Sequence, residues 1–143
     1  MNPINRQVEN LLYKYNLMFT FKLKLFITFL LLFLVEVGIA LWVDDAIIRP
    51  FFGDFLAVIA LFFLLKTFLV MSDLNLAFAS LSMAYLLEFL QYCNFLKLVG
   101  LEKYKIIAIV LGSSFDWRDI FAYTLGIFAV FLFNKETLGL NKV

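Results

Sequence analysis

The chain has 143 residues, of which 64% are hydrophobic and 19 are phenylalanine, and its mean hydropathy is +0.97. This composition is far more apolar than that of soluble domains and predicts an all-α integral membrane protein. The 12 Lys and Arg nearly balance the 11 Asp and Glu, so no basic surface indicates a nucleic-acid partner.

The chain has no histidine, and Cys93 is its single cysteine. An internal disulfide is therefore excluded, and zinc, haem and Ser-His-Asp chemistries lose their usual ligand or base. A carboxylate-only site for Mg²⁺ or Ca²⁺ stays open, but we predict neither a metal nor a cofactor. The length leaves room for one membrane domain and no soluble catalytic domain, which disfavours an enzyme.

Four apolar runs reach the roughly 20 residues that a helix needs to cross a bilayer. They cover residues 22–43, 51–71, 74–93 and 115–133. Arg49-Pro50 opens the second run, where the missing N–H of proline costs nothing. Ser72-Asp73 leaves a hairpin-sized link, which predicts that the second and third helices are antiparallel neighbours.

Two further segments, 1–21 and 104–111, have features of pieces at the membrane surface. In the amino-terminal segment 1–21, Val8, Leu11, Leu12 and Tyr15 recur at the spacing of an interfacial amphipathic helix, although a frayed tail is the alternative. The run at 104–111 is too short to span and fits an interfacial or re-entrant piece. Residues 22–133 form the membrane domain, and residues 134–143 form a tail.

Lys and Arg residues indicate the orientation. The amino-terminal flank is basic, whereas Arg49 is the one basic residue in the first loop. Positive charge favours the cytoplasmic side, and four spans return the chain to that side. Both termini are therefore expected in the cytoplasm, although the three lysines of the last loop oppose this orientation.

Acidic residues lie inside or at the ends of the apolar runs, where a charge costs roughly 2.5 kcal/mol or more. Counted from the side on which the first and third helices start, Glu36 and Glu88 lie at the same depth, about 21 Å along. Asp54, Asp116 and Asp119 begin the other two helices from the opposite side. All five are thus predicted to share one half of the bilayer.

Helical periodicity groups further polar residues with these acids. Tyr85, Glu88, Gln91 and Tyr92 form one stripe, and Asp116, Asp119, Tyr123 and Gly126 form another. Such stripes should face the interior of the bundle. The candidate ligand-binding residues are Glu36, Arg49, Asp54, Glu88, Gln91, Asp116, Arg118, Asp119 and Tyr123; no catalytic residue is assigned.

Several candidates also have a structural interpretation. Asp54 could equally cap its helix, and Asp116 stands at a capping-box spacing from Ser113. Arg49 and Arg118 could reach lipid head groups or pair with the acids. Gln91 and Tyr123 could form hydrogen bonds between helices, whereas Gly126 most simply allows close packing. Glu36, Glu88 and Asp119 lie in apolar sequence that explains them less easily, which favours a function.

Three elements in combination resemble a family of small bacterial membrane proteins, domain of unknown function 2809. They are Arg-Pro-x-x-Gly-Asp at 49–54, Glu-x-x-Gln at 88–91 and Asp-x-x-Asp-x-x-x-Tyr-x-x-Gly at 116–126. The resemblance extends from Glu36 to Phe133. It implies a multi-pass protein of the bacterial cytoplasmic membrane.

The later half is also similar to the VanZ-like proteins, in which a Glu-x-x-Gln helix precedes a helix with an Asp and a Gly. VanZ is associated with resistance to a glycopeptide antibiotic, so this resemblance implies a role at the cell envelope. VanZ-like chains commonly carry Asn beside the last glycine, whereas residues 122–126 here read Ala-Tyr-Thr-Leu-Gly.

Three functional hypotheses follow. The favoured one is a polar pocket in the outer half of the membrane that binds an amphiphile or envelope lipid, with aromatic walls around its tail. The second is a proton-coupled exporter in which Glu36 exchanges a proton for a small cationic amphiphile. The third is a structural subunit whose acids only hold helices together. Membrane lipids are the expected partners, and a homodimer would help to enclose a cavity.

Overall fold

The computed structural model describes residues 4–7, 20–45, 47–101, 103–104 and 114–133. Its helices are α2 (Leu23–Trp42), α3 (Ile48–Phe68), α4 (Asp73–Tyr92), the single turn α5 (Phe95–Leu98) and α7 (Trp117–Phe133). α2, α3 and α4 are each long and apolar enough to cross a membrane. The described part of the chain is therefore all-helical, as predicted, and has the features of a membrane protein.

The fourth predicted span corresponds to α7, which has 17 residues. α5 lies in what the sequence analysis treats as a loop, and Asn94 and Gly100 on either side of it have positive φ angles. Of the amino-terminal segment 1–21, residues 4–7 are helical and residues 20–21 lead into α2. The amphipathic stretch at 8–19, most of the run at 104–111 and the tail at 134–143 lie outside the described residues.

α3 begins about one turn earlier than predicted, because a residue of the preceding loop caps it. Asp45 Oδ1 accepts hydrogen bonds from the backbone N–H of Ile47 at 2.8 Å and of Ile48 at 2.7 Å. These N–H groups would otherwise lack partners at the start of the helix. Pro50 still falls in the first turn, where its missing N–H does not interrupt the helix.

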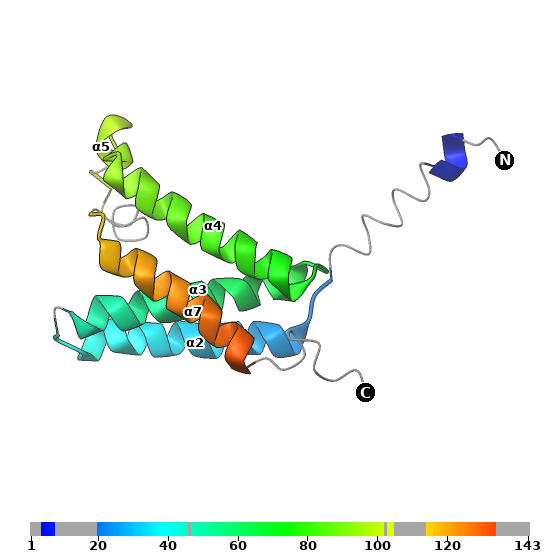
Figure 1. Ribbon diagram of the computed structural model, residues 1–143, viewed down its shortest axis with the longest axis horizontal. Helices are drawn as coiled ribbons and strands as arrows, with labels where there is room; N and C mark the ends of the chain where they lie inside the picture. Colours follow the sequence, from blue (N-terminus) through cyan, green and yellow to red (C-terminus); the bar gives the residue numbers. More distant parts are fainter. Residues whose placement is uncertain (1–3, 8–19, 46, 102, 105–113, 134–143) are drawn as a thin grey trace.

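α3 and α4 form the predicted hairpin. Ser72 caps α4 by accepting a hydrogen bond from the backbone N–H of Asn75 at 3.3 Å. Lys66 near the end of α3 forms a salt bridge of 2.7 Å with Asp73 at the start of α4, and both side chains are mostly buried. The two helices are held together at this end, and they diverge toward the other (Figure 1).

Figure 1 shows that α2 and α3 run antiparallel and that α7 lies between α3 and α4 toward one end of the molecule. The chain before α2 is tied to the end of α3, because Thr20 donates its backbone N–H to the Phe68 carbonyl and Lys22 donates to the Thr67 carbonyl. The opposite end of the bundle then holds the last turns of α2 and α4 and the first turns of α3 and α7. Glu36, Asp54, Glu88 and Asp119 therefore lie toward the same end of the molecule.

The core lies among α3, α4 and α7. Phe62 and Val58 of α3 pack with Leu76 of α4 and Ile127 of α7. α2 contributes no buried residue and packs on α3 with one face. Many of its large apolar side chains are exposed. Such a surface is what a helix in contact with lipid requires, because hydrocarbon solvates apolar side chains.

Candidate functional site

The hydroxyl group of Tyr123 joins three helices. Tyr123 on α7 donates to Asp54 Oδ1 on α3 at 3.0 Å and to Glu88 Oε1 on α4 at 3.3 Å. The tyrosine side chain is 8% exposed and Glu88 is 1% exposed. A tyrosine hydroxyl carries one hydrogen, so it cannot satisfy two carboxyl groups fully at the same time.

Glu88 has a further unsatisfied atom. Its Oε2 is buried without a partner at hydrogen-bond distance among the described residues, although the backbone of Asp116 also acts on the Glu88 carboxyl as a hydrogen-bond donor. A buried oxygen without a partner costs about 1 to 3 kcal/mol, and more if the group is charged. This atom therefore favours a bound donor, such as a proton, a water molecule or a ligand group.

Asp119 in the first turn of α7 is a third acid close to Asp54 and Glu88. Its carboxyl lies within hydrogen-bonding range of the Asp54 carboxyl, and its charge acts on Glu88 as well. We call Asp54, Glu88, Asp119 and Tyr123 the acidic cluster. Its three carboxyl groups come from three different helices, and among the described residues no Lys or Arg forms a salt bridge with any of them.

The candidate cations lie outside the acidic cluster. The Arg118 guanidinium binds Asp116 through Nε and Nη2, and Asp116 Oδ1 also accepts the Arg118 backbone N–H at 2.9 Å. The pair is partly exposed and lies at the start of α7, and Ser113, the predicted capping-box partner of Asp116, lies outside the described residues. Arg49 is exposed in the first turn of α3, and it forms no salt bridge with a described residue.

Glu36 and Gln91, the other two candidate residues, are not members of the acidic cluster. Glu36 lies on α2 near the same end of the molecule, half-buried, and it makes no hydrogen bond or salt bridge with a described residue. The predicted common depth is therefore compatible with the structure, but Glu36 does not join the acidic cluster. Gln91 is half-buried on α4, three residues after Glu88.

Gly126 sets the distance between α3 and α7. A Cβ atom at Gly126 would lie 2.5 Å from the Phe55 carbonyl oxygen and 2.5 Å from Val58 Cγ1. These helices can approach so closely only without a side chain at this position, as the close-packing interpretation predicted. Phe55 follows Asp54, and Gly126 lies three residues after Tyr123, so the approach brings the carboxyl and the hydroxyl together.

Thr124, for which the sequence pattern predicts no role, forms a second polar contact between α4 and α7. The Thr124 hydroxyl donates to the Ile120 carbonyl at 2.7 Å, so Tyr85 must be the donor in the 2.6 Å hydrogen bond between the two side chains. Tyr85 belongs to the predicted polar stripe of α4, so a contact of its side chain with another helix could be expected. The short hydroxyl of Thr124 gives no such signal, because it could equally bond its own helix.

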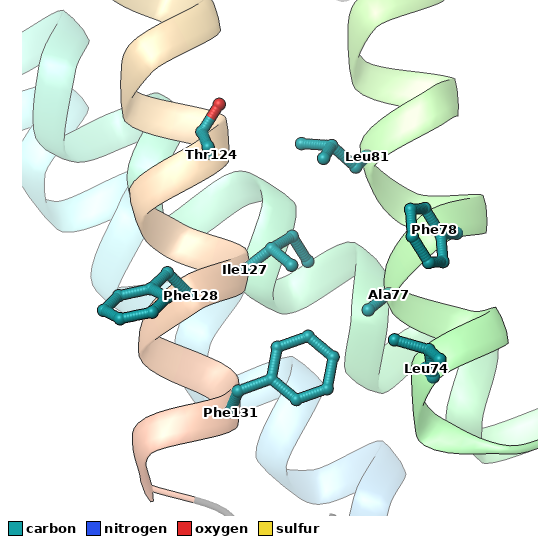
Figure 2. A pocket seen from close by; sticks show the side chains of 8 residues that line it. All are labelled: Leu74, Ala77, Phe78, Leu81, Thr124, Ile127, Phe128 and Phe131. Atoms are coloured by element: carbon teal, nitrogen blue, oxygen red, sulfur yellow. The ribbon is translucent and has the colours of Figure 1, made fainter.

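An apolar pocket of about 240 Å³ opens between α4 and α7 on the other side of this contact (Figure 2). It is lined by Leu74, Ala77, Phe78, Leu81, Thr124, Ile127, Phe128 and Phe131. Figure 2 shows Ile127 and Phe131 pointing from α7 toward α4, with the Thr124 hydroxyl at the end near Leu81. We call this pocket the α4–α7 groove.

The model of one protein family matches residues 43–127 of the chain, which is more than half of it. The family is described as Protein of unknown function (DUF2809). The chain belongs to this family. The matched region contains the whole acidic cluster of this DUF2809 protein, whereas Glu36 precedes it. No curated protein and no solved structure matches the chain.

The carboxyl groups of the acidic cluster can accept hydrogen bonds from a bound cation. Within the described residues, no group of three or more His, Cys, Asp or Glu side chains is arranged to hold a metal. The carboxyl oxygens can instead accept hydrogen bonds from an ammonium group, which has three donors. A charge-assisted bond of this kind is about twice as strong as a neutral one.

Proposed function

We propose that this DUF2809 protein binds an amphiphile in the membrane and that the acidic cluster receives its positively charged head. The observation that carries the proposal is the shared Tyr123 hydroxyl beside the unpartnered Glu88 Oε2. Tyr123 is the one hydroxyl donor that the three carboxyl groups share, and among the described residues no Lys or Arg forms a salt bridge with them, although the Arg118 charge acts on Asp119. A primary ammonium would supply both further donors and a positive charge. The resemblance to VanZ-like proteins points to a ligand of the cell envelope.

The proposal includes the membrane arrangement. α7 acts as the fourth span; its 17 residues extend about 25 Å, which is near the lower limit for crossing. Both termini then lie on the cytoplasmic side, and the acidic cluster lies in the outer half of the membrane. A ligand would reach the cluster from the outer leaflet.

Binding of dodecylamine tests the proposal, with the purified protein in nanodiscs of zwitterionic lipid and calorimetry as the readout. We expect saturable binding to the natural protein and at least about tenfold weaker binding to Glu88→Gln, since a buried charged hydrogen bond contributes about 1.5 to 3 kcal/mol. The amide oxygen of the variant can still accept the Tyr123 hydrogen bond, so the fold should persist. Dodecyl sulfate, with the same tail and an anionic head, should not compete.

Asp44→Asn is the matched control. Asp44 is an exposed acid in the loop between α2 and α3, so this variant loses the same charge at the same end of the molecule. It should bind dodecylamine like the natural protein. Equal affinity of Glu88→Gln and the natural protein would contradict the proposal and would leave the acids with a structural role.

A second candidate is exchange of a proton for the cation at the same cluster. The crowding of three carboxyl groups around one hydroxyl favours it, because a bound cation and a proton would compete for the same oxygens. Proton release on binding of dodecylamine, measured by calorimetry in buffers of different ionisation enthalpy, would support it. Glu36, which the exporter hypothesis used, is not needed in this version.

A further inference from the structure

The α4–α7 groove and the acidic cluster lie on the same two helices. On α4, Leu81 of the groove and Glu88 of the cluster are seven residues apart, which places them about 20° apart around the helix and roughly 10 Å apart along it. On α7, Thr124 of the groove follows Tyr123 of the cluster. The hydrogen bond between Tyr85 and Thr124 stands at the boundary between the two.

The groove is suited to an apolar group. Seven of its eight lining side chains are hydrocarbon, and three of these are phenylalanine. The one polar side chain, Thr124, already donates its hydroxyl hydrogen to Ile120 and accepts from Tyr85. The lining side chains therefore offer no free hydrogen-bond donor to a polar ligand group.

The shape of the groove fits a chain that enters from the side. Its volume of about 240 Å³ exceeds the roughly 150 Å³ of an apolar cavity that binds benzene. Ala77 and Ile127 are buried in its floor, whereas Leu74, Phe78 and Phe128 at its rim are more than half exposed. In a membrane this rim faces lipid, so an alkyl chain could enter without crossing water.

We propose that the α4–α7 groove holds the alkyl chain of the same amphiphile whose ammonium head binds the acidic cluster. The inference rests on the proposed function and narrows its ligand class to a single-chain alkylamine. The head lies beyond the Tyr85–Thr124 bond, and the chain runs along α4 from Leu81 toward Leu74. A small tetraalkylammonium ion without a chain would bind more weakly, because it leaves the groove empty.

A dodecylamine analogue with a diazirine at the end of its chain tests this inference. After irradiation of the full-length protein in nanodiscs, mass spectrometry should find the label mainly in peptides covering 74–81 and 124–131. Unlabelled dodecylamine should displace it. Leu74→Trp, which fills the mouth of the groove, should reduce this labelling severalfold, whereas Leu86→Trp on an exposed face of the same helix should not.

The outcomes separate the inference from the proposed function. If the label spreads over exposed positions of α2 while binding remains dependent on Glu88, the chain lies in bulk lipid and the inference is wrong. If dodecylamine binding does not depend on Glu88, the proposed function fails and this inference fails with it. Labelling of the groove that falls in both Glu88→Gln and Leu74→Trp supports the two together.

Discussion

A single hydroxyl group determines how the acids of this protein relate to one another. Tyr123 bonds Asp54 and Glu88, which lie 69 and 35 residues before it in the sequence. Because α3 begins at Ile48, Asp54 lies beyond the first turn of the helix, and Asp45 in the preceding loop accepts the backbone N–H groups of Ile47 and Ile48. The sequence predicts the Asp54 carboxyl either as a helix cap or as a ligand contact. In the structure it forms a hydrogen bond from α3 to Tyr123 on α7.

Tyr123→Phe removes that hydroxyl and keeps the ring. We expect a loss of about 1 to 3 kcal/mol in the free energy of unfolding, because two carboxyl groups lose their shared donor while they stay largely buried. Denaturation with sodium dodecyl sulfate in mixed micelles measures this change. Tyr85→Phe is the control, and its loss should be smaller, because the Tyr85–Thr124 bond is more exposed.

At the scale of the helix, the site depends on how closely α3 and α7 approach. Gly126 allows the contact, and Val58 and Phe55 occupy the space where a side chain would lie. Small residues such as Ala84 and Ala122 are likewise buried between the helices. Close packing of this type stabilises helix pairs in lipid, where apolar burial gives no net gain.

Gly126→Ala should force α3 and α7 apart. The expected cost is about 1 to 3 kcal/mol, as for other overpacked positions, and dodecylamine affinity should fall because Tyr123 moves away from Asp54. Thermal unfolding and calorimetry measure the two effects. Gly53→Ala is a matched control, since a Cβ there meets no atom within 4 Å; unchanged affinity in both variants would show that the approach does not position the cluster.

The start of α3 should depend on pH. Hydrogen bonds from the backbone of Ile48 and then Ile47 hold the pKa of Asp45 below its usual value. A lowered pKa means that this stabilisation is present above the unfolded value of about 3.9 and is lost as the pH falls through the folded pKa. The amide resonances of Ile47 and Ile48 should therefore shift with a midpoint below about 3.9; a midpoint at or above that value would contradict the capping bond.

For the whole molecule, the order of the four long helices could be predicted because each apolar run is close to the length of a span, whereas the single turn α5 was not predicted. The position of the acids toward one end of the helices could be predicted from the helix rise per residue alone. Helix rise does not give the order of helices around the bundle. For this reason the sequence could not show that Glu36 lies outside the acidic cluster whereas Asp54 belongs to it. Pairing of Arg118 with an acid was one of two alternatives that the sequence left open, and the structure shows it with Asp116. The α4–α7 groove depends on side-chain directions that hydropathy does not contain.

The two long-range bonds of Tyr123 also have a consequence for biogenesis. During synthesis α3 and α4 leave the ribosome before α7, so Asp54 and Glu88 emerge before the tyrosine that bonds them. α4 is the least apolar of the three candidate spans and carries a carboxyl that becomes buried, so its insertion should be the weakest step. Arrival of α7 would then both complete the cluster and secure α4 in the bilayer, and chains truncated before Trp117 should leave α4 accessible to the translocation machinery and to membrane proteases.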